Sequence, residues 1–382
     1  GRGGKWSNTD FYLLGYCYYK QEDYANAIQQ FNKIIGGTNS VSQNAYYHLA
    51  ECYLKLDKKQ EALNAFRNAS QMDFKPEIQK DAFLNYARLS YEVGNAYESV
   101  PLVITNYLDT YPNDEHQEEM QTLLVDSFIT SKNFAGAMEL LEKNKGYATK
   151  ATYQKVAFYR GIELFMETDY AGASETLEKS LKNAEDLTFK ARADYWKAEA
   201  DYLLNRFDAA AAGFLSVKQK TSSGLQTFLP DVDYSLAYAY FKQKDYDKAI
   251  TYFAAFTEKG SSDIAKLNDG YLRLGDSYFA TSKYWPAIET YNKALALSGP
   301  EKDYASYQKG MSYGFVGKGD TKIESLENFI SQYTRSSLRD DALYELGNSY
   351  INDGQESKGL QAYNRLIREF RASSLVPQAL MR

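Results

Sequence analysis

The side chains that could support catalysis or metal binding are few in this chain of 382 residues. It contains two histidines, His48 and His116, and two cysteines. His116 lies in the acidic stretch Asn113-Asp114-Glu115-His116-Gln117-Glu118-Glu119, whose oxygen and nitrogen donors could in principle hold a metal ion. The same carboxylates also suit the first turn of a helix that follows Tyr111-Pro112, because they complement the positive end of its dipole. We therefore expect neither a metal site nor a bound cofactor.

Two further motifs have simpler structural interpretations. His48 lies among Tyr46, Tyr47 and Leu49, where a packed or surface imidazole is expected rather than a catalytic one. The glycine-rich segment 314–320 matches neither spacing of a phosphate-binding loop and follows no strand pattern, so a turn between helices is expected. No Ser/His/Asp or Cys/His arrangement can be assembled from the sequence. We therefore expect that the chain is not an enzyme.

Composition excludes several other classes of function. Charged residues make up 25% and hydrophobic residues 44% of the chain, as in ordinary globular proteins, and the net charge is -6. Without a basic patch, nucleic acid is not an expected partner. No apolar run approaches the roughly 18 residues that a membrane span needs. The chain begins without methionine and ends in what resembles the start of another hairpin, so we expect a fragment of a longer protein.

A short pattern recurs along the whole chain and predicts its architecture. A small residue is followed twelve positions later by alanine and sixteen positions later by an aromatic residue or leucine, and seven of ten copies fit both positions. A fixed period of this kind indicates supersecondary units that bury their apolar faces against their neighbours. The ten small residues, which we call anchors, are spaced 35 to 39 residues apart at Gly15, Ala50, Ala87, Val125, Gly161, Ala198, Ala237, Gly275, Gly310 and Gly347.

Each copy reads as two amphipathic helices, because apolar positions fall at i, i+3, i+4 and i+7. The pattern resembles that of the tetratricopeptide repeat family, W-x2-L-G-x2-Y…A-x3-F…P, through Phe11, Leu14, Gly15, Tyr18, Ala27 and Phe31. The resemblance implies an all-α, right-handed α-solenoid of about ten stacked helical hairpins. We expect one continuous solenoid over residues 1–382, with a possible stretched loop at 218–230. Pro101, inside the second half of the third copy, predicts a kink there.

A second aromatic pattern falls three residues before most anchors and continues one and four residues after some of them. These positions share one helix face. In the family that the sequence resembles, this face of the first helices lines a concave groove for partner peptides or helices, which implies a tyrosine-rich groove here. The alternative is that the rings pack between hairpins and thicken the core. The predicted partner-binding residues are Tyr12, Tyr16, Tyr19, Tyr47, Phe158, Tyr195, Tyr234, Tyr238, Tyr307 and Tyr344.

The expected function is therefore a non-enzymatic scaffold or adaptor that binds protein partners along this groove. Two alternatives are a regulatory or substrate-recruiting arm of an enzyme whose catalytic domain lies outside these residues, and a glycan-binding module. Two joints between copies, around Tyr111-Pro112 and at 329–342, resemble those of bacterial envelope proteins with such repeats. This favours a bacterial cell envelope location, in the periplasm or as an anchored lipoprotein, with the cytoplasm as the alternative. The sequence predicts no oligomeric state.

Overall fold

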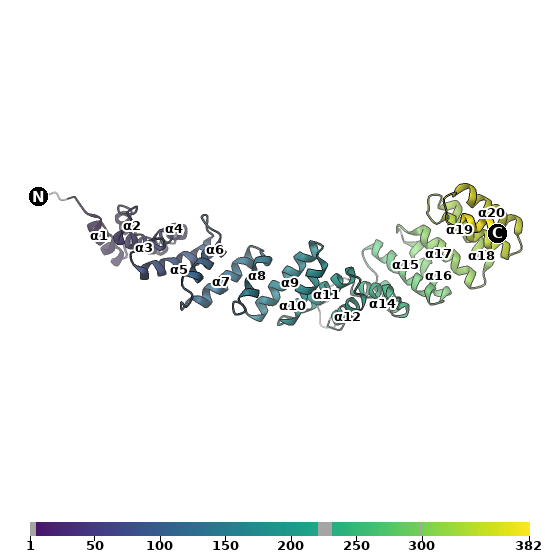
Figure 1. The fold of residues 1–382 in the computed structure, drawn as a ribbon, viewed down its shortest axis with the longest axis horizontal. Coiled ribbons are helices and arrows are strands. Elements are labelled where there is room, and N and C mark those ends of the chain that lie inside the picture. Colours follow the sequence, from purple (N-terminus) through teal and green to yellow (C-terminus); the bar gives the residue numbers. More distant parts are fainter. Residues whose placement is uncertain (1–4, 221–230, 298) are drawn as a thin grey trace. The chain divides into compact units, whose positions relative to one another are not determined.

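The computed structural model describes residues 5–220, 231–297 and 299–382, which form 21 α-helices and no β-strand (Figure 1). The chain divides into two compact units, an N-terminal unit of residues 1–160 and a C-terminal unit of residues 161–382. The division falls within α9. The helices up to that point are α1 (Asn8–Lys20), α2 (Tyr24–Phe31), α3 (Ser40–Lys55), α4 (Lys59–Ser70), α5 (Pro76–Val93), α6 (Val100–Thr110), α7 (Gln117–Thr130), α8 (Phe134–Lys143) and α9 (Lys150–Met166).

The C-terminal unit continues with twelve helices in the same alternation of first and second helices. They are α10 (Tyr170–Lys182), α11 (Leu187–Leu203), α12 (Phe207–Lys220), α13 (Val232–Lys242), α14 (Tyr246–Lys259), α15 (Ile264–Ala280), α16 (Tyr284–Ala296), α17 (Lys302–Phe315), α18 (Gly319–Gln332), α19 (Arg339–Asn352), α20 (Glu356–Glu369) and α21 (Val376–Met381). Every anchor lies on an odd-numbered helix from α1 to α19, so each predicted copy is one helical hairpin.

Packing follows chain order within each unit, because each described helix contacts chiefly the helices before and after it. This arrangement confirms the predicted all-α solenoid of stacked hairpins. The continuity of a single solenoid over residues 1–382 stays a prediction, since each unit is defined by its own internal contacts.

The core of each hairpin forms where the sequence pattern places it. The alanine twelve residues after the anchor is fully buried in every copy that has it, as at Ala27, Ala173 and Ala287. The residue at position sixteen is at most 2% exposed, as at Phe31, Phe214 and Tyr291. Gly275 and Gly347 face these residues directly, since a Cβ built on either would lie within 2.6 Å of a tyrosine ring carbon. The small anchors therefore allow the two helices to approach closely.

The turns inside the hairpins share one feature that the sequence did not reveal. The residue seven positions after every anchor has a positive φ between 55° and 78°. Only three of these residues are glycine, so the hairpins impose a left-handed conformation on residues that otherwise avoid it. One of the three is Gly317, which confirms that segment 314–320 is an inter-helix turn. The ten residues are Glu22, Asp57, Gly94, Lys132, Thr168, Asn205, Lys244, Ser282, Gly317 and Gly354.

Two local expectations need correction or lie outside the described residues. Pro101 occupies the first turn of α6, where the missing backbone N–H would be unpaired in any case, so it begins the helix instead of kinking it. Residues 218–220 of the stretched loop expected at 218–230 belong instead to α12, which continues to Lys220. Residues 221–230 lie outside the described part of the chain.

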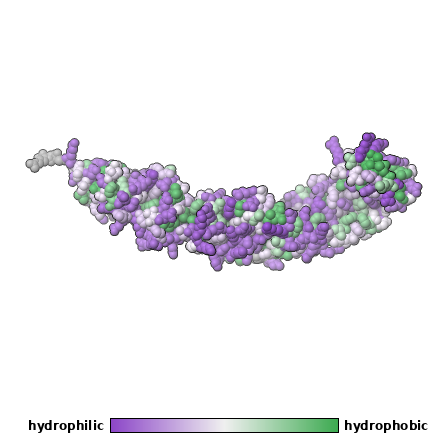
Figure 2. Space-filling model, in the orientation of Figure 1, coloured by the Kyte–Doolittle hydropathy of each residue, from purple (hydrophilic) through white to green (hydrophobic). Residues whose placement is uncertain are grey.

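The surface is mainly hydrophilic, with separate hydrophobic patches on the face that Figure 2 shows. Some large apolar side chains are exposed, including Trp285 at 51% and Leu380 at 68%. Among the described residues, no helix combines the length and apolar character that crossing a lipid bilayer requires.

The close approach at the anchors can be tested at the last hairpin. A Cβ at Gly347 would lie 2.4 Å from Cε1 of Tyr363, whose ring is 2% exposed and cannot move aside freely. We expect Gly347→Ala to lower the free energy of unfolding by about 1–2 kcal/mol, because overpacking outweighs the gain in helix propensity. Urea denaturation followed by circular dichroism measures the change.

Gly319→Ala is the matched control, because no atom lies within 4 Å of the Cβ it would add at the start of α18. This variant should be as stable as the wild type or slightly more stable. Equal stability of the two variants would show that helix approach at Gly347 is not limiting.

Candidate functional site

The predicted partner-binding residues lie on the first helices of the hairpins, and nine of the ten are half-buried. Phe158 is the exception. Its side chain is fully buried, so it belongs to the core and offers no surface to a partner, which corrects the prediction for that position. We call the face that carries the other nine, at positions −3, +1 and +4 relative to the anchors, the first-helix face.

The tyrosine hydroxyls on this face connect neighbouring hairpins. Tyr234 on α13 donates a hydrogen bond of 2.7 Å to Oδ2 of Asp269 on α15, and Tyr47 on α3 donates in the same way to Asp81 on α5. In both pairs the tyrosine lies three residues before its anchor and the aspartate lies six residues before the next anchor. The ring therefore packs within its own hairpin while the hydroxyl is fixed by the following one.

Tyr195 and Tyr307 also lie three residues before their anchors, and Asp231 and Asp341 lie six residues before the next anchors. Burial raises the pKa of Tyr195, and Glu199 and Asp231 raise it further. Burial also raises the pKa of Tyr307, with Asp341 as the next cause. The carboxylates disfavour a second negative charge at these phenols, so the rings remain neutral hydrogen-bond donors well above neutral pH. The rings are thus partly exposed and also join adjacent hairpins, so packing between hairpins does not exclude the predicted groove.

A polar network extends this connection across three first helices of the C-terminal unit. Tyr238 donates to Oδ2 of Asp269 at 2.5 Å, and Nε of Arg273 donates to Oδ1 of the same carboxylate at 3.3 Å. Arg273 also pairs with Asp276 at 2.7 Å, and Asp276 accepts a hydrogen bond of 2.9 Å from Tyr304 on α17. Burial raises the pKa of Asp276, although Arg273 opposes that shift. The network fixes the side chains of α13, α15 and α17 relative to one another.

The N-terminal unit carries an aromatic cluster centred on His48. The ring centroids of Tyr16 and Tyr19 both lie 5.2 Å from the imidazole, and that of Tyr47 lies 5.5 Å from it. The Nδ1 atom of His48 is 2.7 Å from Oε2 of Glu51. Burial raises the pKa of Tyr19 to about 12, and Glu51 adds to the shift. His48 is thus a packed imidazole, as the sequence indicated.

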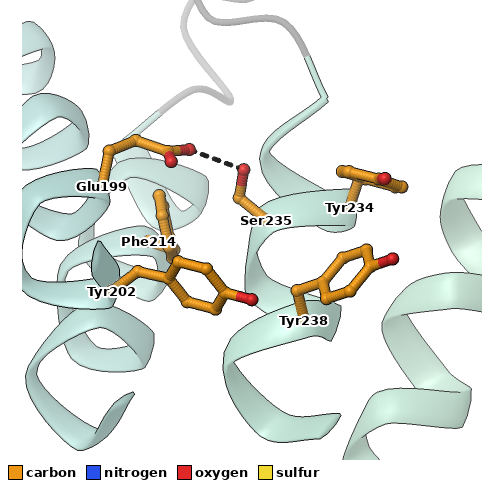
Figure 3. Close-up of a pocket in the computed structure, with 6 residues that line it drawn as sticks. All are labelled: Glu199, Tyr202, Phe214, Tyr234, Ser235 and Tyr238. Carbon is orange, nitrogen blue, oxygen red and sulfur yellow. Dashed lines mark hydrogen bonds between the residues drawn. The ribbon is translucent and has the colours of Figure 1, made fainter. Parts of the chain in front are cut away.

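The C-terminal unit has a cavity between the sixth and seventh hairpins of the chain, at the place that corresponds to the His48 cluster. Its volume is about 240 Å³, and Figure 3 shows the side chains around it. They come from α11, α12 and α13, and Phe214, 1% exposed, belongs to the core below. Ser235 donates a hydrogen bond of 2.7 Å to Oε1 of Glu199. The lining residues are Glu199, Tyr202, Phe214, Tyr234, Ser235 and Tyr238.

The remaining polar clusters do not resemble a catalytic centre. His116 lies 3.5 Å from Glu119, which Arg88 pairs with at 2.6 Å and 2.7 Å. Arg88 lowers the pKa of Glu119, so this carboxylate acts as an ion-pair partner. In residues 5–220, 231–297 and 299–382, no group of three or more histidine, cysteine, aspartate or glutamate side chains is placed to hold a metal ion.

Comparison with known families agrees with the hairpin register. A model described as tetratricopeptide repeat matches residues 231–259 and 341–373, which include α13 and α14 and the hairpin of α19 and α20. A second model, described as anaphase-promoting complex, cyclosome, subunit 3, matches residues 3–69. The matched segments are thus tetratricopeptide repeats, and the other described hairpins repeat with the same period. Proteins of this fold are in general non-catalytic scaffolds for protein–protein interaction.

Several solved structures resemble this chain in fold. The C-terminal part of a TPR repeat-containing protein from Cytophaga hutchinsonii is 14% identical, with 67% of this chain and 98% of that chain covered and a TM-score of 0.49. YrrB, described as a TPR protein with an unusual peptide-binding site, is 18% identical over 55% of this chain and all of its own, with a TM-score of 0.43. Yeast Tom70 is 14% identical over 98% of this chain and 94% of its own, with a TM-score of 0.35. No curated protein matches the sequence.

The acidic partners of the tyrosines were missed by the sequence interpretation. Asp269, Arg273 and Asp276 were not predicted as site residues, and neither were Glu199 and Ser235 at the cavity. A signal existed, because aspartate recurs six residues before four of the ten anchors. These residues are Asp81, Asp231, Asp269 and Asp341.

Removing one hydroxyl tests the connection between hairpins. Tyr238→Phe keeps the ring and loses the hydrogen bond to Asp269, so we expect the free energy of unfolding to fall by about 1–2 kcal/mol. Tyr202→Phe is the control, because the Tyr202 hydroxyl forms no hydrogen bond within the described part of the chain. Urea denaturation should show no change for the control. An equal loss in both variants would contradict the proposed role of Asp269.

The same phenols predict a dependence of stability on alkaline pH. Burial and the hydrogen bond to Asp269 raise the pKa of Tyr234 and Tyr238 in the folded state above the value of about 10 for an unfolded chain. Their contribution to stability is therefore complete below about pH 10 and declines as the pH rises further. The melting temperature should fall as the pH rises from about 10 to about 12.

A variant carrying both Tyr234→Phe and Tyr238→Phe should show a smaller fall over this interval, because phenylalanine does not ionise. An identical fall in the wild type and the double variant would argue against a contribution from these two phenols.

Proposed function

We propose that this chain binds extended or helical segments of partner proteins along its first-helix face. The observation that carries the proposal is the arrangement of tyrosine rings on that face. Tyr234 and Tyr238 are half-buried, their hydroxyls are held by Asp269, and their rings line an open cavity. The rings are therefore already ordered before any partner binds.

This order favours binding, because the tyrosine side chains lose little conformational entropy when a partner binds. Tyrosine also offers a large contact area with few rotatable bonds. In the N-terminal unit, Tyr12 and Tyr16 stack with a centroid distance of 6.1 Å, and Tyr16 and Tyr19 with 6.0 Å. Both units thus present adjacent aromatic rings that suit the side chains of a peptide.

The proposed binding of partner segments requires only a surface and no catalytic residues. The two alternatives from the sequence, an arm of a larger enzyme and a glycan-binding module, stay predictions that no observation favours over peptide binding. The same holds for the bacterial cell envelope as the compartment.

Selection from a phage-displayed library of random 16-residue peptides tests the proposal on the full 382-residue chain. We expect enriched peptides whose affinity, measured by isothermal titration calorimetry, falls at least tenfold in Tyr16→Ala or in Tyr238→Ala, because aromatic residues dominate such interfaces. Tyr238→Phe, which keeps the ring, should bind nearly as the wild type does.

Trp285→Ala is the control, because it removes an exposed aromatic side chain of α16, a second helix. Circular dichroism first establishes that each variant is folded. Failure to enrich any peptide, or equal binding by Tyr16→Ala, Tyr238→Ala and the wild type, would overturn the proposal.

A further inference from the structure

We infer that the cavity between the sixth and seventh hairpins receives a basic side chain, lysine or arginine, of the bound partner. This inference rests on the proposed peptide-binding function and names the chemistry that one part of the first-helix face recognises. The cavity combines three tyrosine rings, a buried phenylalanine and one carboxylate, that of Glu199. Aromatic faces and a carboxylate are the groups that attract a cation attached to an alkyl chain.

Two of the three tyrosines that line the cavity, Tyr234 and Tyr238, offer it only their rings. The hydroxyls of Tyr234 and Tyr238 both donate to Asp269 on α15, outside the cavity. Figure 3 shows these two hydroxyls directed away from Glu199. The Tyr234 ring already attracts one cation of the chain itself, because Nζ of Lys266 lies 5.4 Å from its centroid. Lys266 is not among the residues that line the cavity.

Glu199 differs from the other carboxylates nearby in its partners. Asp231 is paired with Lys266, Asp233 with Lys218, and Asp269 with Arg273. Within the described residues, no lysine, arginine or histidine lies within ion-pair distance of Glu199. Its hydrogen-bond partners are the hydroxyls of Ser235 and Tyr195, which carry no charge. The cavity therefore holds negative charge that no residue of the described chain neutralises.

The N-terminal unit shows the same arrangement with its site already filled. Relative to the anchors, Tyr16, Tyr19 and Tyr47 occupy the positions that Glu199, Tyr202 and Tyr234 occupy in the cavity. His48 stands where Ser235 stands, and its imidazole lies among the rings with Nδ1 2.7 Å from Glu51. The carboxylate of this cluster is that of Glu51, which occupies in its hairpin the position that Tyr238 occupies at the cavity. A basic side chain of the chain itself thus occupies the space that serine leaves open.

The peptides selected on the full chain provide the test. We expect them to contain a lysine or arginine whose replacement by methionine weakens binding on the order of tenfold. Glu199→Gln, which keeps an acceptor for Ser235, should weaken the original peptide equally and should not affect the methionine peptide. Glu289→Gln, at an exposed site on α16, makes the same change of charge and should leave affinity unchanged.

Two further pairs of variants separate loss of recognition from loss of folding. Ser235→His should fill the cavity, as His48 does in the first unit, and abolish the preference for a basic residue, whereas Ser235→Ala should retain it. Tyr202→Phe should retain affinity because the ring remains, and Tyr202→Leu should reduce it.

The outcomes distinguish this inference from the function on which it rests. Peptides that bind through the tyrosine rings but without a basic residue, or that bind Glu199→Gln as tightly as the wild type, would overturn the inference and leave peptide binding intact. Absence of any enriched peptide would overturn both.

Discussion

The close approach of two helices at a small residue is the constraint on which the rest of this structure depends. A glycine or alanine at the anchor lets the second helix place its alanine and aromatic residue against the first, as Tyr291 lies against Gly275. Once that contact is fixed, the other side chains of the first helix point toward the neighbouring hairpin or toward solvent. The first-helix face is therefore a consequence of packing in the core.

The same contact determines the geometry of the turn. Ten residues at one position after the anchors adopt a left-handed backbone conformation, and most of them are not glycine. Such a conformation costs roughly 1–2 kcal/mol for residues with a Cβ atom. Burial of the large residue sixteen positions after the anchor, and of the alanine before it where present, outweighs this cost. The flanking helices, rather than intrinsic backbone preference, thus keep polar turn residues such as Asn205 and Lys244 at positive φ.

Polar contacts between first helices give the stack a second kind of order. The rings of Tyr47 and Tyr234 pack within one hairpin, and their hydroxyls bind a carboxylate of the next. A single side chain therefore stabilises the stack and also presents an ordered surface. This dual role explains why counting aromatic residues could not decide between core and groove.

The sequence by itself determined the hairpin period, the all-α class and the residues of the core, because small and large apolar residues must alternate wherever helices pack closely. It also located the nine tyrosines of the first-helix face. It did not reveal that the tenth predicted residue, Phe158, is fully buried. Only the tertiary structure decided which carboxylate each hydroxyl meets. It also decided that His48 fills its aromatic cluster while Ser235 leaves a cavity, since both results depend on side chains from two hairpins. Residues more than thirty positions apart, such as Tyr234 and Asp269, become partners through stacking.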